Sequence, residues 1–365
     1  MPASPTSRRA RLLRPVLAVA ALGALACDLP TSVPTWSTMW EVPARTASLD
    51  VGALLPDGVT VDASRTAFLF SGSRIEFYES LGGACGYACA AAQGATVPKP
   101  EFTAAFQATT FLPARIDSAQ LEGGRIAVRI TNGLGFDPLR PGATQRGGSL
   151  SLVITSGGRE VARESLSGEQ WALPANGGVI ERSVALTAGR VLREVEVRVA
   201  LYSPAGDAVR IDTAQRISVV ATVDSTRIAS ASISVRDEEI SSTAVALDLD
   251  GVPDGAVNRV EGGSLVLDVS NPFDVHSTSI GVDSTRAYIF ADGRLIAKTF
   301  AIAPGDNRVV LDFTADELRA ILGSSTVDFD VHGYVSAPDG GVTVTPAQQI
   351  GIVSRLRLTL RSTER

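Results

Sequence analysis

Residues 265–271 read LVLDVSN, and residues 126–132 read IAVRITN. In both stretches apolar residues alternate with polar or small ones, and both runs end in asparagine. A period of two places one set of side chains on a buried sheet face and the other set in water. Each stretch is therefore predicted to be a β-strand with one buried face, and the shared ending indicates that the two strands are copies of one element.

The similarity between these stretches extends outward along the chain. Further matching segments follow in the same order in both halves, at a spacing of about 127–140 residues. The matched positions are Asn132 with Asn271, Phe136 with Phe273, Arg159 with Arg294, Leu186 with Phe313, Tyr202 with Val335 and Thr213 with Pro346. Several matches in one order indicate two tandem copies of one domain. We place the first copy at 113–225 and the second, with a polar linker at its start, at 226–365.

The fold class follows from the same alternation. A sheet with one apolar face must cover that face, and a second sheet is the cover that a strand-rich chain can supply. We therefore predict an all-β chain of tandem, Ig-like antiparallel β-sandwiches with only short helices. The clearest helix is 314–322, where Thr314 and Glu317 form a capping-box sequence. Short strand-like runs between 48 and 112 predict a small N-terminal β domain.

The second copy resembles a known family. Residues 269–274, Val-Ser-Asn-Pro-Phe-Asp, precede a strand, a Gly293-Arg294 turn, a second strand, a Pro304-Gly305 turn and a short helix. This order is similar to that of the WHy domains of water-stress and late-embryogenesis proteins, which carry a strand ending in Asn-Pro. The resemblance covers residues 260–335 and implies a small β-sandwich without known catalysis.

The first 26 residues form a targeting segment. Arginines and no acid precede an apolar stretch of 12 residues, which is too short to cross a bilayer as a helix. The sequence Ala24-Leu25-Ala26-Cys27 resembles the lipobox of bacterial lipoproteins, in which the cysteine is diacylated and becomes the new N-terminus. The resemblance implies a signal peptide at 1–26 and lipidation, by chains such as palmitate, at Cys27. An ordinary secretory signal with a coincidental cysteine is the alternative.

Two acyl chains anchor a protein stably without spanning the membrane. The mature protein is thus expected in the cell envelope, on a bacterial membrane and facing the periplasm or the exterior; both inner and outer membrane stay open. Residues 27–47 are rich in proline and predict a tether. Trp36 and Trp40 either dock on the folded body or lie at the headgroup boundary. We expect docking, because the acids beside them disfavour an interfacial helix.

The remaining cysteines, Cys85 and Cys89, lie in a glycine-containing stretch of the exported part of the chain. Disulfides persist outside the cytoplasm, and a pair four residues apart in a loop can reach the required separation. We predict that these two cysteines form a disulfide that staples a loop. A metal site is the alternative, but neither histidine lies near them in the sequence.

No catalytic constellation stands out. The histidines are His276 and His332, and neither lies near a Gly-x-Ser-x-Gly elbow, so we expect no enzyme and no cofactor. His332 alternates with Asp328 and Asp330 on one strand face, a pattern that a solvated face explains better than a metal site. A weak calcium candidate is an Asp-rich loop that a Pro-Asp-Gly turn explains better. Its carboxylates are Asp248, Asp250 and Asp254.

Charge and composition restrict the partners. Removal of residues 1–26 takes away four arginines, which changes the net charge from −6 to −10. An acidic chain without a basic run is not expected to bind nucleic acid. The favoured function is a membrane-anchored, non-enzymatic envelope lipoprotein whose sandwiches give structural support or bind an envelope protein. The alternatives are a carrier of a lipid or small hydrophobic ligand, which needs an apolar pocket above about 300 Å³, and a calcium-dependent adhesion protein.

Overall fold

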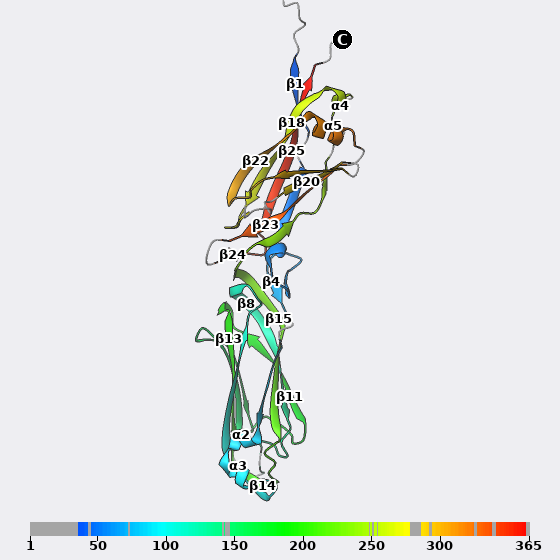
Figure 1. Cartoon of the computed structure of the whole chain (residues 1–365). Helices are drawn as coiled ribbons and strands as arrows, with labels where there is room; N and C mark the ends of the chain where they lie inside the picture. Colours follow the sequence, from blue (N-terminus) through cyan, green and yellow to red (C-terminus); the bar gives the residue numbers. More distant parts are fainter. Residues whose placement is uncertain are drawn as a thin grey trace, which may run out of the picture.

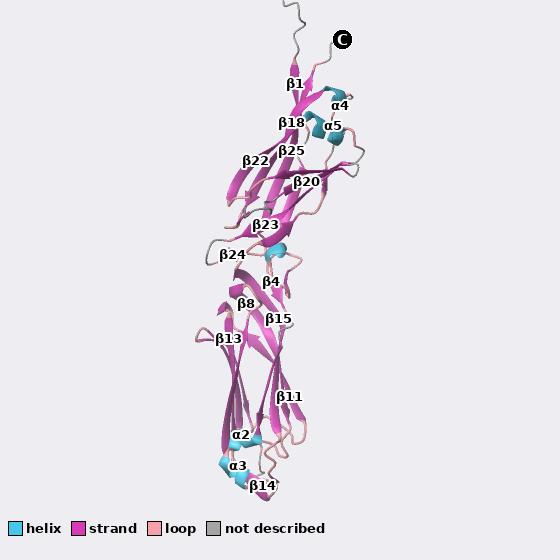
Figure 2. Ribbon diagram, viewed as in Figure 1, coloured by secondary structure: helices cyan, strands magenta, loops and turns pink. Residues whose placement is uncertain are grey.

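The computed structural model shows two β-sandwiches stacked end to end in an elongated molecule (Figure 1). It describes residues 36–42, 45–71, 74–140, 142, 147–247, 249, 252–253, 255–277, 286–291, 294–324, 327–337 and 341–362. Strands dominate and the helices are short, which confirms the predicted all-β class (Figure 2). The predictions at Cys27, Asp248, Asp250 and Asp254 lie outside the described residues.

The first sandwich consists of an eight-stranded and a four-stranded sheet. Its strands are β3 (Val59–Val61), β4 (Phe68–Phe70), β5 (Arg74–Ser80), β7 (Phe102–Phe111), β8 (Ile116–Asn132), β9 (Ser149–Ser156), β10 (Arg159–Ser167), β11 (Gly178–Leu186), β12 (Gly189–Leu192), β13 (Glu194–Ser203), β15 (Arg216–Ile233) and β24 (Val342–Val344). The larger sheet has the order β11-β8-β15-β4-β3, with β12 also on β8, and β5 and β24 also on β15. The smaller sheet has the order β10-β9-β13-β7.

The second sandwich consists of a five-stranded and a six-stranded sheet. Its strands are β1 (Ser37–Glu41), β2 (Arg45–Asp50), β16 (Glu238–Ser241), β17 (Val245–Ala246), β18 (Val260–Asn271), β19 (His276–Ser277), β20 (Arg286–Ala291), β21 (Arg294–Thr299), β22 (Gly305–Phe313), β23 (Val327–Ser336) and β25 (Gln349–Arg361). One sheet has the order β1-β25-β18-β22, with β2 also on β25; the other has the order β16-β23-β20-β21, with β17 and β19 also on β23.

Two short helices accompany the second sandwich: α4 (Ala256–Arg259) and α5 (Ala315–Leu322). The expected capping box begins α5, because Thr314 Oγ1 accepts from the Glu317 N–H and the Glu317 carboxylate accepts from the Thr314 N–H. Leu318 and Ile321 turn inward and are fully buried. The predicted helix is therefore confirmed, and it lies at the same end of the molecule as β1 (Figure 1).

The two sandwiches share one strand order. Within the sheets, β11-β8-β15 and β10-β9-β13 of the first correspond to β22-β18-β25 and β21-β20-β23 of the second. The stretches that opened the sequence analysis lie in β8 and β18, the equivalent strands. Their alternate apolar residues are at most 8% exposed, so each contributes roughly 1.5–3 kcal/mol by burial. The repeat in the sequence is thus matched by a repeat in topology.

The asparagines that end β8 and β18 are buried and make the same local contacts. In each, the side-chain N–H donates to the carbonyl four residues later, at 2.9 Å. The side-chain oxygen accepts from the N–H two residues later, at 2.9 or 3.0 Å. These groups are Asn132 with Phe136 and Leu134, and Asn271 with Val275 and Phe273. The asparagine closes the turn that follows the strand, because its side-chain amide makes the hydrogen bonds that the backbone N–H and carbonyl groups of the turn would otherwise lack.

These contacts correct one pairing in the sequence alignment. By hydrogen bonding, Phe273 corresponds to Leu134, and Phe136 corresponds to Val275, so matching the two phenylalanines was wrong. All of these side chains are buried, and the turn needs apolar residues there without specifying an aromatic ring. The other matched pair, Arg159 and Arg294, begins the equivalent strands β10 and β21.

Residues 48–112 do not form a separate domain, contrary to expectation. Strands β3, β4, β5 and β7 from this range all belong to the first sandwich, where β4 and β5 pair with β15 and β7 pairs with β13. The expected tether at 27–47 is also partly wrong, because β1 and the first residues of β2 pair with β25. So few short strands bury little apolar surface by themselves, whereas the edges of β13, β15 and β25 offer unpaired backbone groups.

Backbone hydrogen bonds connect the two sandwiches at the joint between them. Strand β24 pairs with the last residues of β15, and the Ala337 N–H donates to the Val235 carbonyl at 2.9 Å. A 3₁₀ helix, η1 (Val51–Leu54), lies at the same joint and contacts β16. Arg115 forms an ion pair with Glu238 and donates to the Leu55 carbonyl. Because ladder bonds cross the joint, the molecule is built as a rod.

Candidate interaction site at the tip of the first sandwich

The end of the rod that lies far from β1 and the chain's C-terminus is capped by short elements (Figure 1). They are α2 (Leu81–Cys85), α3 (Tyr87–Ala91), β6 (Thr96–Lys99) and β14 (Gly206–Arg210). We call residues 81–98 the tip. Residues 81–98 carry no charged side chain, although 20% of the chain is charged, and the exposed Asp207 and Arg210 of β14 lie at the same end. Protein-binding surfaces are depleted of charge at their centre, so this composition suits a contact surface.

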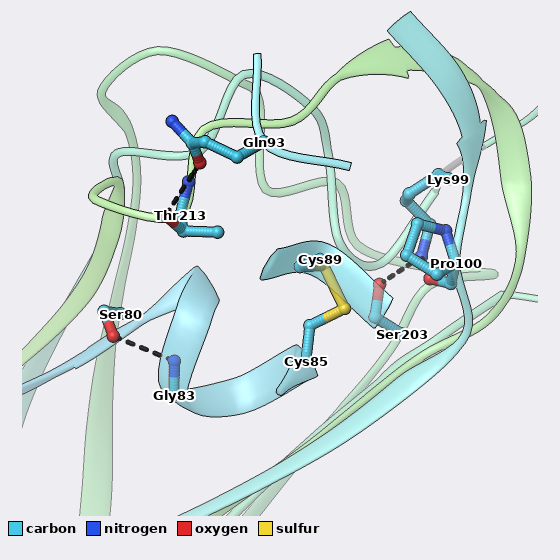
Figure 3. Close-up of a disulfide and its surroundings, with 9 residues drawn as sticks. All are labelled: Ser80, Gly83, Cys85, Cys89, Gln93, Lys99, Pro100, Ser203 and Thr213. Carbon is cyan, nitrogen blue, oxygen red and sulfur yellow. Dashed lines mark hydrogen bonds between the residues drawn. A yellow bond between two sulfur atoms is a disulfide. The ribbon is translucent and has the colours of Figure 1, made fainter. Parts of the chain in front are cut away.

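A disulfide holds the tip together. Cys85 and Cys89 are bonded, with their Cα atoms 5.6 Å apart, as the sequence analysis predicted (Figure 3). Cys89 is fully buried, and the bond links α3 to α2. Between the two helices Gly86 has φ of 62° and ψ of −138°, a conformation that a residue with Cβ rarely adopts.

Polar contacts clamp the tip to the loop before β15. Gln93 Oε1 accepts from both the N–H and the hydroxyl of Thr213, at 2.8 and 2.7 Å (Figure 3). The Gly82 N–H donates to the Thr213 carbonyl at 3.0 Å. Ser80 caps α2 by accepting from the Gly83 N–H at 3.0 Å. The tip is therefore held at both of its ends, and its backbone is ordered before any partner arrives.

Tyr87 is the prominent side chain of the tip. It is 89% exposed, and its neighbours Ala88, Ala90 and Ala91 are exposed and small. Tyrosine is enriched among the residues that dominate binding energy, because it offers a large amphipathic surface for little loss of side-chain freedom. Because the disulfide restrains the backbone that carries Tyr87, binding through this side chain loses less conformational entropy.

Below the tip lies a buried lysine that the sequence analysis left without a role. Lys99 is 1% exposed, and its Nζ donates to Ser203 Oγ at 2.8 Å and to the Pro100 carbonyl at 3.0 Å (Figure 3). The rings of Phe102 and Phe136 face the ammonium group at 5.0 and 5.4 Å. Burial lowers the pKa of Lys99 to about 8, although the charge of Glu101 opposes that shift.

An amine beside a serine hydroxyl is the arrangement of a Ser–Lys nucleophile pair. Here Ser203 is fully buried, and its hydroxyl donates to the Pro138 carbonyl at 2.8 Å. A substrate has no route to that oxygen, so this geometry serves the interior of the sandwich. The only signal in the sequence was that Lys99 is one of two lysines in an arginine-rich chain.

The aspartate–histidine strand face does not gather into a site. His332 Nε2 lies 3.5 Å from Asp330 Oδ2, and Asp328 is on the same face of β23. The ring of Tyr288 packs edge-on against His332, with centroids 5.4 Å apart. Within the part of the chain that the structure describes, no three His, Cys, Asp or Glu side chains converge to hold a metal ion.

An apolar cavity of about 80 Å³ lies between the two sheets of the first sandwich. Its lining residues include Phe70, Phe111, Leu121, Ile154, Val197 and Ile228. One polar atom there stands out: Thr226 is 3% exposed, and its hydroxyl has no hydrogen-bond partner among the described residues. The volume is well below the roughly 300 Å³ at which ligand pockets begin.

Comparisons with known proteins add little. No family model matches the chain, and no curated protein matches it. It is similar to a solved structure of a predicted secreted protein from Parabacteroides distasonis, at 11% identity and a TM-score of 0.33, covering 89% of this chain and 100% of that one. A structure of infectious bursal disease virus, Gx strain, is 16% identical, with a TM-score of 0.15 and coverage of 91% and 75%. Likenesses this distant carry no argument about function.

Among the residues that the structure describes, no helix has the length and apolar character that crossing a bilayer requires.

Proposed function

We propose that this protein is a non-enzymatic lipoprotein of the bacterial cell envelope, acylated at Cys27, whose two sandwiches hold the tip away from the membrane to contact another envelope protein. The observation that carries the proposal is the placement of the ends. The described chain begins and ends at one end of the rod, and the tip lies at the other (Figure 1).

The reach of the anchor supports this orientation. Residues 28–35 separate Cys27 from Trp36, the first described residue, and they span at most about 30 Å when extended. An acyl group at Cys27 would therefore keep the second sandwich near the membrane surface. The first sandwich and its tip would stand beyond it, because the joint between the sandwiches is a backbone ladder.

The tip has the properties of a contact site. It combines a segment without charged residues, a disulfide and one highly exposed tyrosine. The carrier alternative is less well supported, since the cavity in the first sandwich measures about 80 Å³. The calcium-dependent alternative depends on Asp248, Asp250 and Asp254, which lie outside the described residues.

Acylation is tested by growing expressing bacteria with an alkyne analogue of palmitate and measuring the mass of the mature protein. We expect the label on the wild-type chain, which should start at Cys27 and carry the added mass of its acyl chains. The Cys27→Ser variant should carry none. A wild-type protein with an unmodified thiol at Cys27 would refute the anchor.

Contact through the tip is tested with a photocrosslinking amino acid placed at position 87 in living cells. The matched control places it at Leu295, which is 51% exposed on the second sandwich. We expect a discrete protein adduct from position 87 and none from position 295, with the adduct reduced when Cys85 and Cys89 are both alanine. The same adducts from both positions, or none from position 87, would contradict a partner at the tip.

A further inference from the structure

The end of the rod opposite the tip exposes large apolar side chains. Trp36 is 68% exposed, Met39 is 73% exposed and Trp40 is 38% exposed. The expectation that Trp36 docks on the body is therefore wrong. All five residues of β1 are exposed, because this strand forms an edge of its sheet and pairs only with β25. Isolated exposed apolar residues need no explanation, but Trp36, directly before β1, together with Met39 and Trp40 on this strand do need one.

A polar hollow of about 330 Å³ lies beside this strand. Three guanidinium groups and one carboxylate line it: Arg259, Arg319, Arg361 and Glu261. The hollow adjoins β1 directly, since Arg361 is the register partner of Ser37 and the Ser362 N–H donates to the Trp36 carbonyl at 2.8 Å. The apolar strand and the arginine-lined hollow thus form one continuous surface.

Two of the three arginines of the hollow are held by weak surface pairs. Arg361 Nε lies 2.8 Å from Glu261, and Arg319 Nη1 lies 2.5 Å from Asp316, which is exposed. Pairs of this kind contribute about 0–1 kcal/mol, so a phosphate can exchange with either carboxylate at little cost. Guanidinium groups match phosphate oxygens in a bidentate geometry. An arginine-lined hollow is notable in a chain of net negative charge.

We infer that this end of the second sandwich, formed by β1 and the hollow, seats on the surface of an anionic phospholipid bilayer. Trp36, Met39 and Trp40 enter the headgroup layer, where tryptophan is favoured. The hollow binds lipid phosphate. The occupant follows from where the chain leads, because the residues before Trp36 run to Cys27, the proposed acylation site. The inference rests on the proposed anchor only for the direction in which the molecule faces.

The test uses the full mature chain carrying Cys27→Ser, so that binding does not depend on acylation. Vesicles of phosphatidylcholine alone and of phosphatidylcholine with phosphatidylglycerol are sedimented with the protein. We expect the protein to bind the anionic vesicles. Its affinity for the neutral vesicles should be at least tenfold weaker. The triple variant Trp36→Ser, Met39→Ser, Trp40→Ser and the double variant Arg259→Gln, Arg319→Gln should each weaken binding at least tenfold. The matched control, Phe290→Ser with Leu295→Ser, should bind like the parent.

Tryptophan fluorescence gives a second readout that does not depend on the folding of these variants. In a Trp171→Phe background, Trp36 and Trp40 should be quenched by brominated lipids in the anionic vesicles. In a Trp36→Phe, Trp40→Phe background, the fluorescence of Trp171 in the first sandwich should not be quenched by these lipids. No binding of the unacylated chain to anionic vesicles, or equal quenching in the two backgrounds, would overturn the inference. Either result would leave acylation of Cys27 standing, because mass spectrometry tests that separately.

Discussion

Replacing the buried lysine below the tip should stabilise the protein. Lys99 has a pKa of about 8 in the folded chain instead of 10.5, a difference that corresponds to about 3 kcal/mol. Between these pH values the unfolded chain holds a proton that the folded chain has lost. The free energy of unfolding therefore rises with pH through this window, and the full cost of burying the charge is present below pH 8.

The Lys99→Met variant removes that cost. Ser203 keeps its hydrogen bond to the Pro138 carbonyl, so the main new loss is the unpaired Pro100 carbonyl, worth about 1 kcal/mol. At pH 7 we therefore expect the variant to be more stable than the parent by about 2 kcal/mol. Its unfolding free energy should stay flat from pH 8 to 10, where that of the parent rises.

The assay is urea unfolding at pH 7, 8, 9 and 10. Trp36 and Trp40 are replaced by phenylalanine in both proteins, so that Trp171 alone reports on the first sandwich. The reasoning is refuted if parent and variant change equally with pH. It is also refuted if Lys99→Met is less stable than its parent at pH 7, since the ammonium would then stabilise the fold through its contacts with Phe102 and Phe136.

Three further predictions concern stability. Asn132→Ala and Asn271→Ala should each cost about 2–4 kcal/mol in chemical unfolding, because each leaves buried backbone groups unpaired; a loss at only one site would contradict their equivalence. Replacing Cys85 and Cys89 by alanine should cost about 2 kcal/mol, as expected for so small a loop, and should leave the far-UV circular dichroism spectrum unchanged. Thr226→Val should raise the unfolding free energy by about 1 kcal/mol, because it removes an unpaired buried hydroxyl; a lower melting temperature would indicate a partner for that hydroxyl.

The sequence was most informative where burial and period act together. The alternation in 126–132 and 265–271 predicted two equivalent strands, and their final asparagines sit in equivalent turns. Local signals also found the capping box of α5 and the disulfide of the tip. Each of these features is decided by residues a few positions apart, which a single sequence displays directly.

Features decided between distant residues escaped prediction. Nothing in residues 37–41 alternates, and they form a strand only because β25 offers them its free edge. Lys99 lies in a short strand with no periodic pattern, and its burial depends on distant Ser203 and Phe136 as well as on nearby Phe102. The apolar character of the surface around Trp36 could be read from the sequence, but its exposure could not.

The pairing of β1 and β2 with β25 has a consequence for an anchor at Cys27. A Pro-rich coil between lipid and body would leave the distance from the membrane to the tip loosely defined, since the end-to-end distance of such a coil fluctuates. Here the chain joins a backbone ladder as soon as it is described, and β25 lies between β1 and β18 within the sheet. The second sandwich then sets the height of the first above the membrane. This connectivity is the property that the proposed spacer role needs.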